Sequence, residues 1–140
     1  MKELKFPKIK RAQLNTLQVN LGYRCNQRCA HCHVNAGPDR TEMMSSETIY
    51  LILKVLEIYQ LNILDITGGA PELHTDFKQL VINARNLGVD IIDRCNLTIL
   101  NEPGYEDMAE FLSDNKVIIT ASMPCYEEAN VDKQRGKGVF

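Results

Sequence analysis

Three cysteines lie within eight residues, in the stretch YRCNQRCAHCHVNAG at positions 23–37. The C-x3-C-x2-C spacing lets one short loop place Cys25, Cys29 and Cys32 around a single metal centre. Their thiolates are soft ligands, which suit a soft metal. A cubane iron–sulfur cluster normally takes four cysteine ligands. Three ligands would leave one iron free to chelate a small molecule, which favours cofactor chemistry over electron storage.

The same segment is also compatible with a structural zinc site, made from the three thiolates and His31 or His33. A non-catalytic metal-binding module, with zinc or iron–sulfur, is therefore the alternative to an enzyme. Colour distinguishes the two metals, since an iron–sulfur cluster absorbs visible light and zinc does not.

Further residues that could bind a ligand lie toward or just after the ends of the later expected strands. They are Gly68, Gly69 and Glu72 in the segment GGAPE, Cys95 and Asn96, and then Ser122 and Cys125. Ligands of parallel α/β sheets bind beyond the carboxyl ends of the strands, so these residues should converge on one site. Taken singly, each has a plainer interpretation as a turn, a satisfied polar group or a small buried hydrophobe.

Alternating apolar stretches and amphipathic segments would position these residues. We expect strands at 16–22, 62–67, 89–100 and 116–122, and helices that begin at Ser45 or Ser46, at Thr75 or Asp76, and within 102–115. The first helix is indicated by Ile49, Ile52, Leu53 and Leu56 at helical spacing. Strands that alternate with helices favour a parallel sheet with right-handed crossovers.

The tail, residues 126–140, is polar and predicts no fourth packed helix, which would leave the last strand as an uncovered edge. His74 and the basic stretch at 133–137 should lie at the surface. The fold class is therefore α/β. We expect a partial (β/α) barrel, similar to a TIM barrel, with about four βα units.

Composition excludes several function classes. The 140 residues carry a net charge of -2, with 16 basic and 18 acidic residues, so no nucleic acid or anionic membrane partner is expected. Residues 1–13 lack the apolar core of a secretory signal, and the apolar stretch 49–59 is too short for a membrane span of about 20 residues. Five cysteines without an export signal indicate the reducing cytoplasm.

The motif CNQRCAHC, placed after a first strand, resembles the signature of radical S-adenosylmethionine (SAM) enzymes. The resemblance implies that Cys25, Cys29 and Cys32 hold a [4Fe-4S] cluster whose open iron binds SAM. A one-electron donor such as flavodoxin or ferredoxin would reduce the cluster. SAM would then split into methionine and a 5'-deoxyadenosyl radical, so no side chain is assigned a catalytic role.

By the same resemblance, six residues would contact SAM: His31, Gly68, Gly69, Glu72, Asn96 and Ser122. The glycine pair resembles the family's glycine-rich segment after the second strand. The acidic residue that usually follows it is displaced to Glu72 by Ala70 and Pro71.

A longer series of motifs resembles the N-terminal portion of the arsenosugar-biosynthesis radical SAM proteins. It comprises CNQRCAHCHVNAGPDRTEMM, DITGGAPEL, RCNLTIL, ASMPCY and NVDKQRGKGVF. This resemblance implies transfer of the deoxyadenosyl group to the arsenic of a small-molecule substrate, a dimethylated trivalent arsenical. Cys95 and Cys125 are hypothesised to bind it, since trivalent arsenic is soft.

The resemblance also sets the expected domain organisation. Residues 1–140 would be the N-terminal part of a radical SAM core domain, without the C-terminal half of the barrel and without a cysteine-rich domain. We expect such a chain alone to be weakly active or inactive, or to need a partner chain that completes the barrel.

Overall fold

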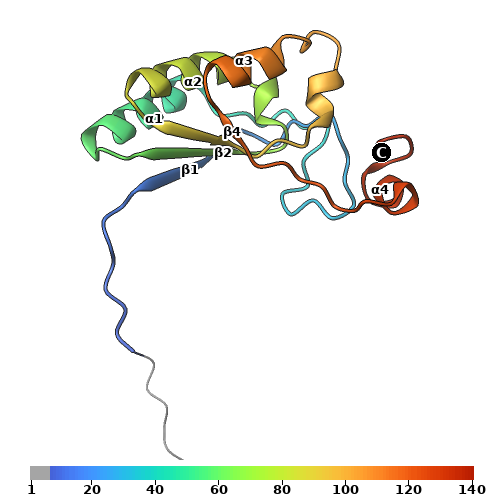
Figure 1. Ribbon diagram of the computed structural model, residues 1–140, viewed down its shortest axis with the longest axis horizontal. Helices are drawn as coiled ribbons and strands as arrows, with labels where there is room; N and C mark the ends of the chain where they lie inside the picture. The colour runs from blue at the N-terminus through green and yellow to red at the C-terminus, as the bar shows by residue number, and fades with distance from the viewer. Residues whose placement is uncertain (1–6) are drawn as a thin grey trace, which may run out of the picture.

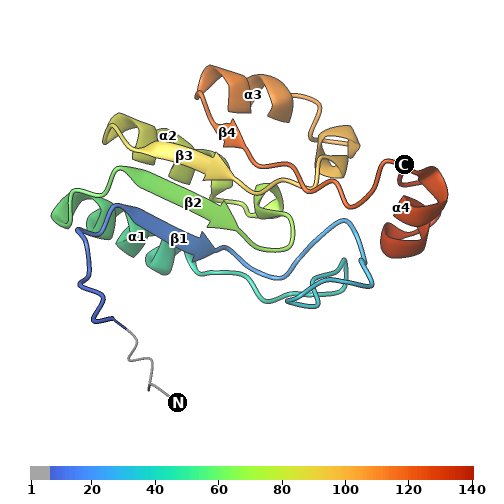
Figure 2. The ribbon, with the colours of Figure 1, turned by 60° about the horizontal axis from the view of Figure 1, so that its bottom comes forward.

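The computed structural model describes residues 7–140, which form one parallel sheet with helices packed on one of its faces (Figure 1). The strands are β1 (Thr16–Asn20), β2 (Ile63–Thr67), β3 (Asp90–Asp93) and β4 (Ile118–Ile119). They lie side by side in sequence order, and every pairing is parallel (Figure 2). The predicted α/β class is confirmed. Part of the segment 1–13, interpreted above as lacking a secretory signal, lies outside the described residues.

Three helices cover one face of the sheet: α1 (Ser46–Ile58), α2 (Phe77–Asn86) and α3 (Met108–Asp114). Helix α1 begins where the sequence indicates, because the Ser45 hydroxyl accepts a hydrogen bond from the Thr48 N–H at 3.3 Å. Asp76 stands at the N-cap of α2 but makes no capping bond; its carboxylate accepts from the Ser46 hydroxyl at 2.6 Å. No helix within residues 7–140 is long and apolar enough to cross a membrane.

The core lies between this helix layer and the sheet. Leu64 and Ile91, from the two central strands, and Phe77 of α2 are fully buried there. The opposite face of the sheet mixes polar side chains with Ile63 and Ile92. On it, Asp65 accepts hydrogen bonds from Gln18 at 2.7 Å and from Arg94 at 2.8 Å.

All four strands are shorter than predicted, and the difference is largest for the last two. The strand expected at 89–100 ends at Asp93, and the 3-10 helix η2 (Thr98–Asn101) follows it. The reason is a local side-chain bond: the Asn96 amide oxygen accepts from Thr98 Oγ1 at 2.9 Å and from the Ile99 N–H at 3.3 Å. Such bonds offer the backbone an alternative to the strand ladder. The strand expected at 116–122 is reduced to Ile118–Ile119, and both residues are exposed.

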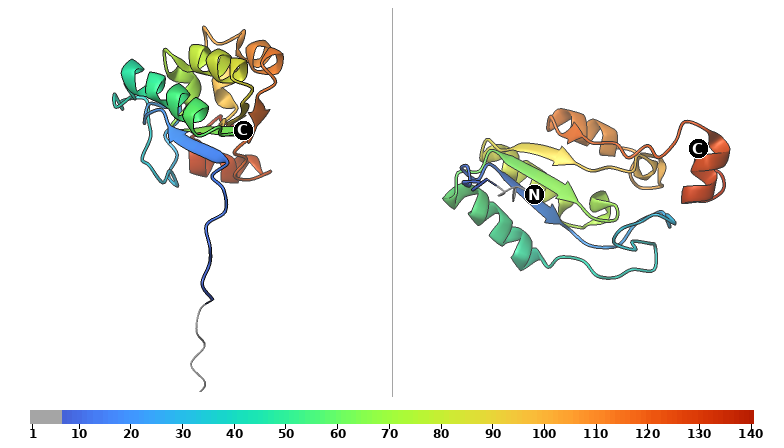
Figure 3. Two further views of the ribbon diagram at one scale, coloured as in Figure 1. Left: turned by 90° about the vertical axis from the view of Figure 1, so that its left-hand side faces the viewer. Right: turned by 90° about the horizontal axis from the view of Figure 1, so that it is seen from below.

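The prediction that the tail holds no packed helix is wrong. Helix α4 (Glu128–Arg135) forms and buries Val131 and Arg135. It lies beyond the carboxyl ends of the strands and not on the sheet face, so β4 keeps an exposed edge (Figure 3). The basic stretch at 133–137 is therefore not wholly a surface segment.

His74 is also buried, contrary to the prediction of a surface position. It follows the 3-10 helix η1 (Pro71–Leu73). Its Nε2 lies 2.8 Å from the Met44 carbonyl oxygen, and its Nδ1 accepts from the Asp76 N–H at 3.0 Å. The ring thus joins the segment before α1 to the start of α2.

Candidate functional site

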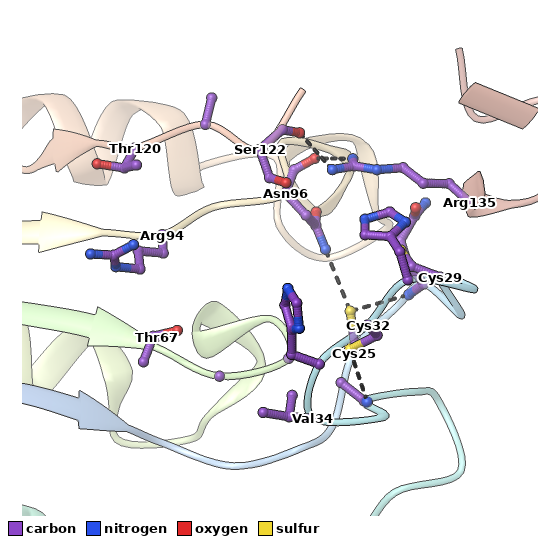
Figure 4. A pocket seen from close by; sticks show the side chains of 17 residues that line it. Cys25, Cys29, Cys32, Val34, Thr67, Arg94, Asn96, Thr120, Ser122 and Arg135 are labelled. Carbon is purple, nitrogen blue, oxygen red and sulfur yellow. Dashed lines mark hydrogen bonds between the residues drawn. The ribbon is translucent and has the colours of Figure 1, made fainter. Parts of the chain in front are cut away.

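A cavity of about 510 Å³ opens at the carboxyl ends of the strands (Figure 4). Among the site residues predicted from the sequence, its lining includes Cys25, Cys29, His31, Cys32, Gly68, Gly69, Asn96 and Ser122. These residues are up to 97 positions apart in the chain, and the parallel topology brings them together as the strand-end argument requires. Glu72, Cys95 and Cys125 lie elsewhere.

The cysteine loop is fixed by backbone hydrogen bonds at its neck. The Cys25 N–H donates to the Gly37 carbonyl, and the Gly37 N–H donates to the Tyr23 carbonyl, both at 3.1 Å. At the tip, the Ala30 N–H donates to the Gln134 carbonyl of α4 at 2.9 Å. The unexpected fourth helix therefore holds the loop that carries the thiols.

Two thiols of the loop lie where burial disfavours their charged form. Burial raises the pKa of the Cys25 thiol, although the N–H of Gln27 donates to its sulfur at 3.4 Å. Burial also raises the pKa of Cys29, and the charge of Arg135 opposes that shift. A metal ion bound at these sulfurs would favour the thiolates, because a coordinated thiol is deprotonated.

Gly68 and Gly69 allow the ends of β1 and β2 to approach closely. A Cβ on Gly68 would lie 2.8 Å from the Gly22 carbonyl oxygen, and one on Gly69 would lie 2.9 Å from the Cβ of Cys25. The Gly69 N–H donates to the Gly22 carbonyl at 3.0 Å. The glycine pair therefore seats the cysteine loop against β2, in addition to lining the cavity.

Asn96 links the end of β3 to the cysteine loop. Its amide nitrogen lies 3.5 Å from Cys25 Sγ and donates to the Asn26 side-chain oxygen at 3.0 Å. Its amide oxygen is occupied by the bonds that start η2. The Asn96 side chain therefore mainly holds the cysteine loop.

Sequence reasoning missed Arg135, which lines the cavity from α4. Its guanidinium donates to the Asn96 carbonyl at 3.1 Å and to the Ser122 carbonyl at 2.5 Å. It thereby ties α4 to the ends of β3 and β4. The sequence places Val131 and Arg135 on one helical face, four positions apart, but does not indicate which neighbours Arg135 meets.

The two cysteines proposed as arsenic ligands lie in different surroundings. Cys125 lines a second cavity of about 420 Å³, which shares Asn96, Ser122 and Arg135 with the first. Cys95 is fully buried beside Glu72 and Asp93 and lines neither cavity. The structure therefore does not bring Cys95 and Cys125 to one substrate position, and Glu72 does not face the first cavity.

The spacing of the loop sulfurs bears on the choice between zinc and a cluster. Around one zinc ion, Zn–S bonds of about 2.3 Å bring the sulfurs within about 4 Å of one another. Within residues 7–140, the one group of three donor atoms closer than 4.8 Å is Glu72, Asp93 and Cys95. The three loop thiols line one cavity but do not all lie within 4.8 Å of one another, so their described positions do not form a closed zinc site.

Comparisons with known proteins agree with this geometry. The model of the radical SAM superfamily matches residues 19–137. A probable GTP 3',8-cyclase of Saccharolobus islandicus (strain Y.N.15.51 / Yellowstone #2) is 30% identical over 94 residues, which are 66% of this chain and 30% of the cyclase. A probable GTP 3',8-cyclase of Saccharolobus solfataricus is 31% identical over 77 residues, 55% of this chain and 25% of that protein.

The fold is also found in a solved structure, that of Streptococcus suis SuiB bound to S-adenosylmethionine. The TM-score is 0.72 at 16% identity, and the match covers 91% of this chain and 29% of SuiB. The predicted partial barrel is confirmed by this likeness, which concerns the fold alone. The chain spans 30% of the length of the first cyclase and 29% of SuiB. The comparisons support the superfamily and do not support the narrower arsenosugar member.

Proposed function

The chain belongs to the radical SAM superfamily, and we propose that Cys25, Cys29 and Cys32 bind a [4Fe-4S] cluster beside which SAM binds in the first cavity. The observation that carries the proposal is that the three thiols, the glycine segment and Ser122 line one cavity at the strand ends. The bound cofactors would supply an electron and a 5'-deoxyadenosyl radical. The protein supplies binding, orientation and exclusion of water.

The residues proposed to contact SAM share this cavity. Gly68 and Gly69 line the cavity with backbone atoms alone. Ser122 lines it with a hydroxyl group that could form a hydrogen bond with SAM. His31 belongs to the cysteine loop, and Asn96 holds that loop to β3. Glu72 is removed from the proposed set because it is buried and does not line the first cavity.

We propose a methylated trivalent arsenical as the substrate. The support is the series of motifs quoted above and the second cavity, which is lined by the sulfur-bearing side chains of Met123 and Cys125. The cavities share lining residues, so a ligand in the second would lie next to one in the first. The GTP named in the relatives is the competing substrate, because the match to the first cyclase covers 66% of this chain.

Turnover in this proposal needs three further conditions. A small one-electron donor, such as flavodoxin or ferredoxin, reduces the cluster. The reaction takes place in the cytoplasm, where the five free cysteines of this chain remain reduced. Further strands, from the same polypeptide or from a partner chain, pair with the exposed β4 and enclose the cavity.

Anaerobic reconstitution followed by electron paramagnetic resonance (EPR) tests the cofactor proposal. The protein should take up about four irons per chain and absorb visible light, and SAM should change the signal of the reduced cluster. Cys29→Ala should abolish the signal, whereas Cys125→Ala, a matched change outside the loop, should leave it intact. Stoichiometric zinc with no colour, or a cluster signal that SAM does not alter, would contradict the proposal.

The substrate is tested on the protein with its cluster bound, because iron then occupies the three loop thiols that would otherwise capture arsenic. A dimethylated trivalent arsenical should bind, and Cys125→Ser should weaken that binding about tenfold or more. Ser113→Ala, at an exposed position of α3 outside both cavities, serves as the control. Stronger binding of GTP than of the arsenical would transfer the proposal to a nucleotide substrate.

A further inference from the structure

Glu72, Asp93 and Cys95 form a compact buried group near the carboxyl ends of β2 and β3. They come from three segments: η1, the last position of β3 and the chain just after β3. One donor atom from each lies within 4.8 Å of the other two. The exposed fractions of the three residues are 3%, 0% and 0%.

The carboxylate oxygens of this group lack the partners that buried charges require. Among residues 7–140, no hydrogen-bond donor from outside this group reaches the two oxygens of Glu72 or the two oxygens of Asp93. Leaving even one buried polar atom unsatisfied is costly, and two adjacent buried carboxylates also repel each other. The arrangement therefore needs a positive charge or retained protons.

We propose that Glu72, Asp93 and Cys95 form a second metal site, separate from the cysteine loop, which binds a borderline divalent cation such as Zn²⁺. The donor set decides the class of ion. Mg²⁺ and Ca²⁺ take oxygen ligands, and Cu(I) takes sulfur ligands, whereas Zn²⁺ binds both thiolates and carboxylates. A carboxylate can bind through both oxygens, so three residues can supply four donor atoms.

The environment of each donor is consistent with a bound cation. Burial raises the pKa of Glu72, and burial together with the charge of Glu72 raises the pKa of Asp93 to about 8. Burial is also the main cause of the raised pKa of the Cys95 thiol. A metal ion reverses this preference, because it binds the deprotonated forms. The Leu97 N–H donates to Cys95 Sγ at 3.2 Å, and such outer hydrogen bonds orient a ligand.

A cation at this position would stabilise two segments that hold the cysteine loop in place. Glu72 follows Ala70, whose N–H donates to the Arg24 carbonyl at the neck of the cysteine loop at 3.0 Å. Cys95 precedes Asn96, which contacts Cys25 Sγ. The ion would therefore fix two of the segments that hold the loop, which is a structural role.

Cobalt spectroscopy on a variant without the cluster ligands tests this site. Replacement of Cys25, Cys29 and Cys32 by serine leaves Cys95 and Cys125 as the remaining thiols of the five in the sequence. Co²⁺ is added during anaerobic refolding, since the donors are buried. We expect about one cobalt per chain and a thiolate-to-cobalt charge-transfer absorption.

Further substitutions in the triple serine variant show which thiol causes the charge-transfer absorption. Cys95→Ser should abolish the absorption, and Cys125→Ser, the matched control, should retain it. Glu72→Gln and Asp93→Asn should each weaken cobalt binding more than about tenfold, since even outer partners of a ligand cost that much. The absence of the band, or a band that follows Cys125, would overturn the site. It would show instead that the two carboxyls are neutralised by retained protons.

A second measurement keeps the test decisive if the serine variant does not fold. The native sequence is reconstituted with its iron–sulfur cluster, and zinc and iron are counted by mass spectrometry. Cys95→Ser should lose about one zinc per chain with the iron content unchanged. Equal zinc in both proteins, or none in the parent, would overturn the site without affecting the cluster proposal.

Discussion

The helix-covered face of the sheet and the carboxyl edge of the same strands are stabilised in different ways. On the covered face, apolar side chains such as Leu64 and Phe77 are fully buried. At the edge, partly exposed residues such as Cys29 and Asn96 are held by hydrogen bonds from loops and from α4. The difference implies that fold stability and cofactor binding reside in separable sets of residues.

Truncation of the core should have the largest effect on stability. Phe77→Ala should lower the free energy of unfolding by about 3–5 kcal/mol, because it removes a fully buried aromatic ring. Urea denaturation measures the change, with Tyr126→Ala, at an 85% exposed position, as the control. Folded Phe77→Ala protein should still bind iron at the loop. Loss of iron from the folded variant would mean that the two regions are not separable.

Addition of a methyl group at the carboxyl edge should affect iron uptake more than it affects the free energy of unfolding. Gly69→Ala places a Cβ 2.9 Å from the Cβ of Cys25, and we expect a cost of about 1–3 kcal/mol and a marked loss of iron uptake. Gly37→Ala is the matched control in the loop, because the nearest atom to its Cβ would be Arg28 Cζ at 4.0 Å. Iron content per chain after reconstitution decides the outcome, and equal uptake by both variants would refute a seating role for Gly69.

The covered face could be predicted from the sequence because its signals are local. Ile49, Ile52 and Leu56 recur at helical spacing, and Ser45 provides the N-cap, so α1 was correctly predicted. The strand-end rule likewise predicted that the cysteine loop, the glycine pair and Ser122 would meet. Both inferences need only periodicity and topology.

Several features near the carboxyl edge of the sheet could not be predicted from local sequence patterns. Burial of Arg135 depends on the carbonyls of Asn96 and Ser122, and these neighbours are set only by the tertiary fold. Burial of His74 similarly depends on Met44, 30 positions earlier in the chain. Strand β3 ended early because Asn96 bonds to its own neighbourhood, which an apolar pattern does not reveal.

Asp65, on the face of the sheet away from the helices, provides an intermediate case with a defined pH dependence. The hydrogen bond from Arg94 lowers the pKa of Asp65, so the unfolded chain binds more protons than the folded chain near the ordinary pKa of an aspartate. This stabilisation is present above that pKa and is lost as the pH falls through it to the lowered value.

Asp65→Asn should therefore destabilise the protein by about 1 kcal/mol at neutral pH, a small value because the Arg94 side chain is 48% exposed. Urea denaturation of the two proteins should converge as the pH is lowered below the ordinary pKa. A difference that stays constant down to acid pH would show that the shape of the amide, and not the lost charge, causes the effect.

The smallest effect is expected on the solvent side of the helix layer, where Lys78 of α2 and Asp107 form an ion pair at 2.6 Å. Both side chains are substantially exposed, at 41% and 65%, so solvent and salt screen their attraction. Asp107→Ala should leave the urea midpoint unchanged within error at physiological salt, although it lies in the same layer as Phe77. A clear shift in that midpoint would show that membership of the helix layer, and not burial against the sheet, determines how much a residue contributes to stability.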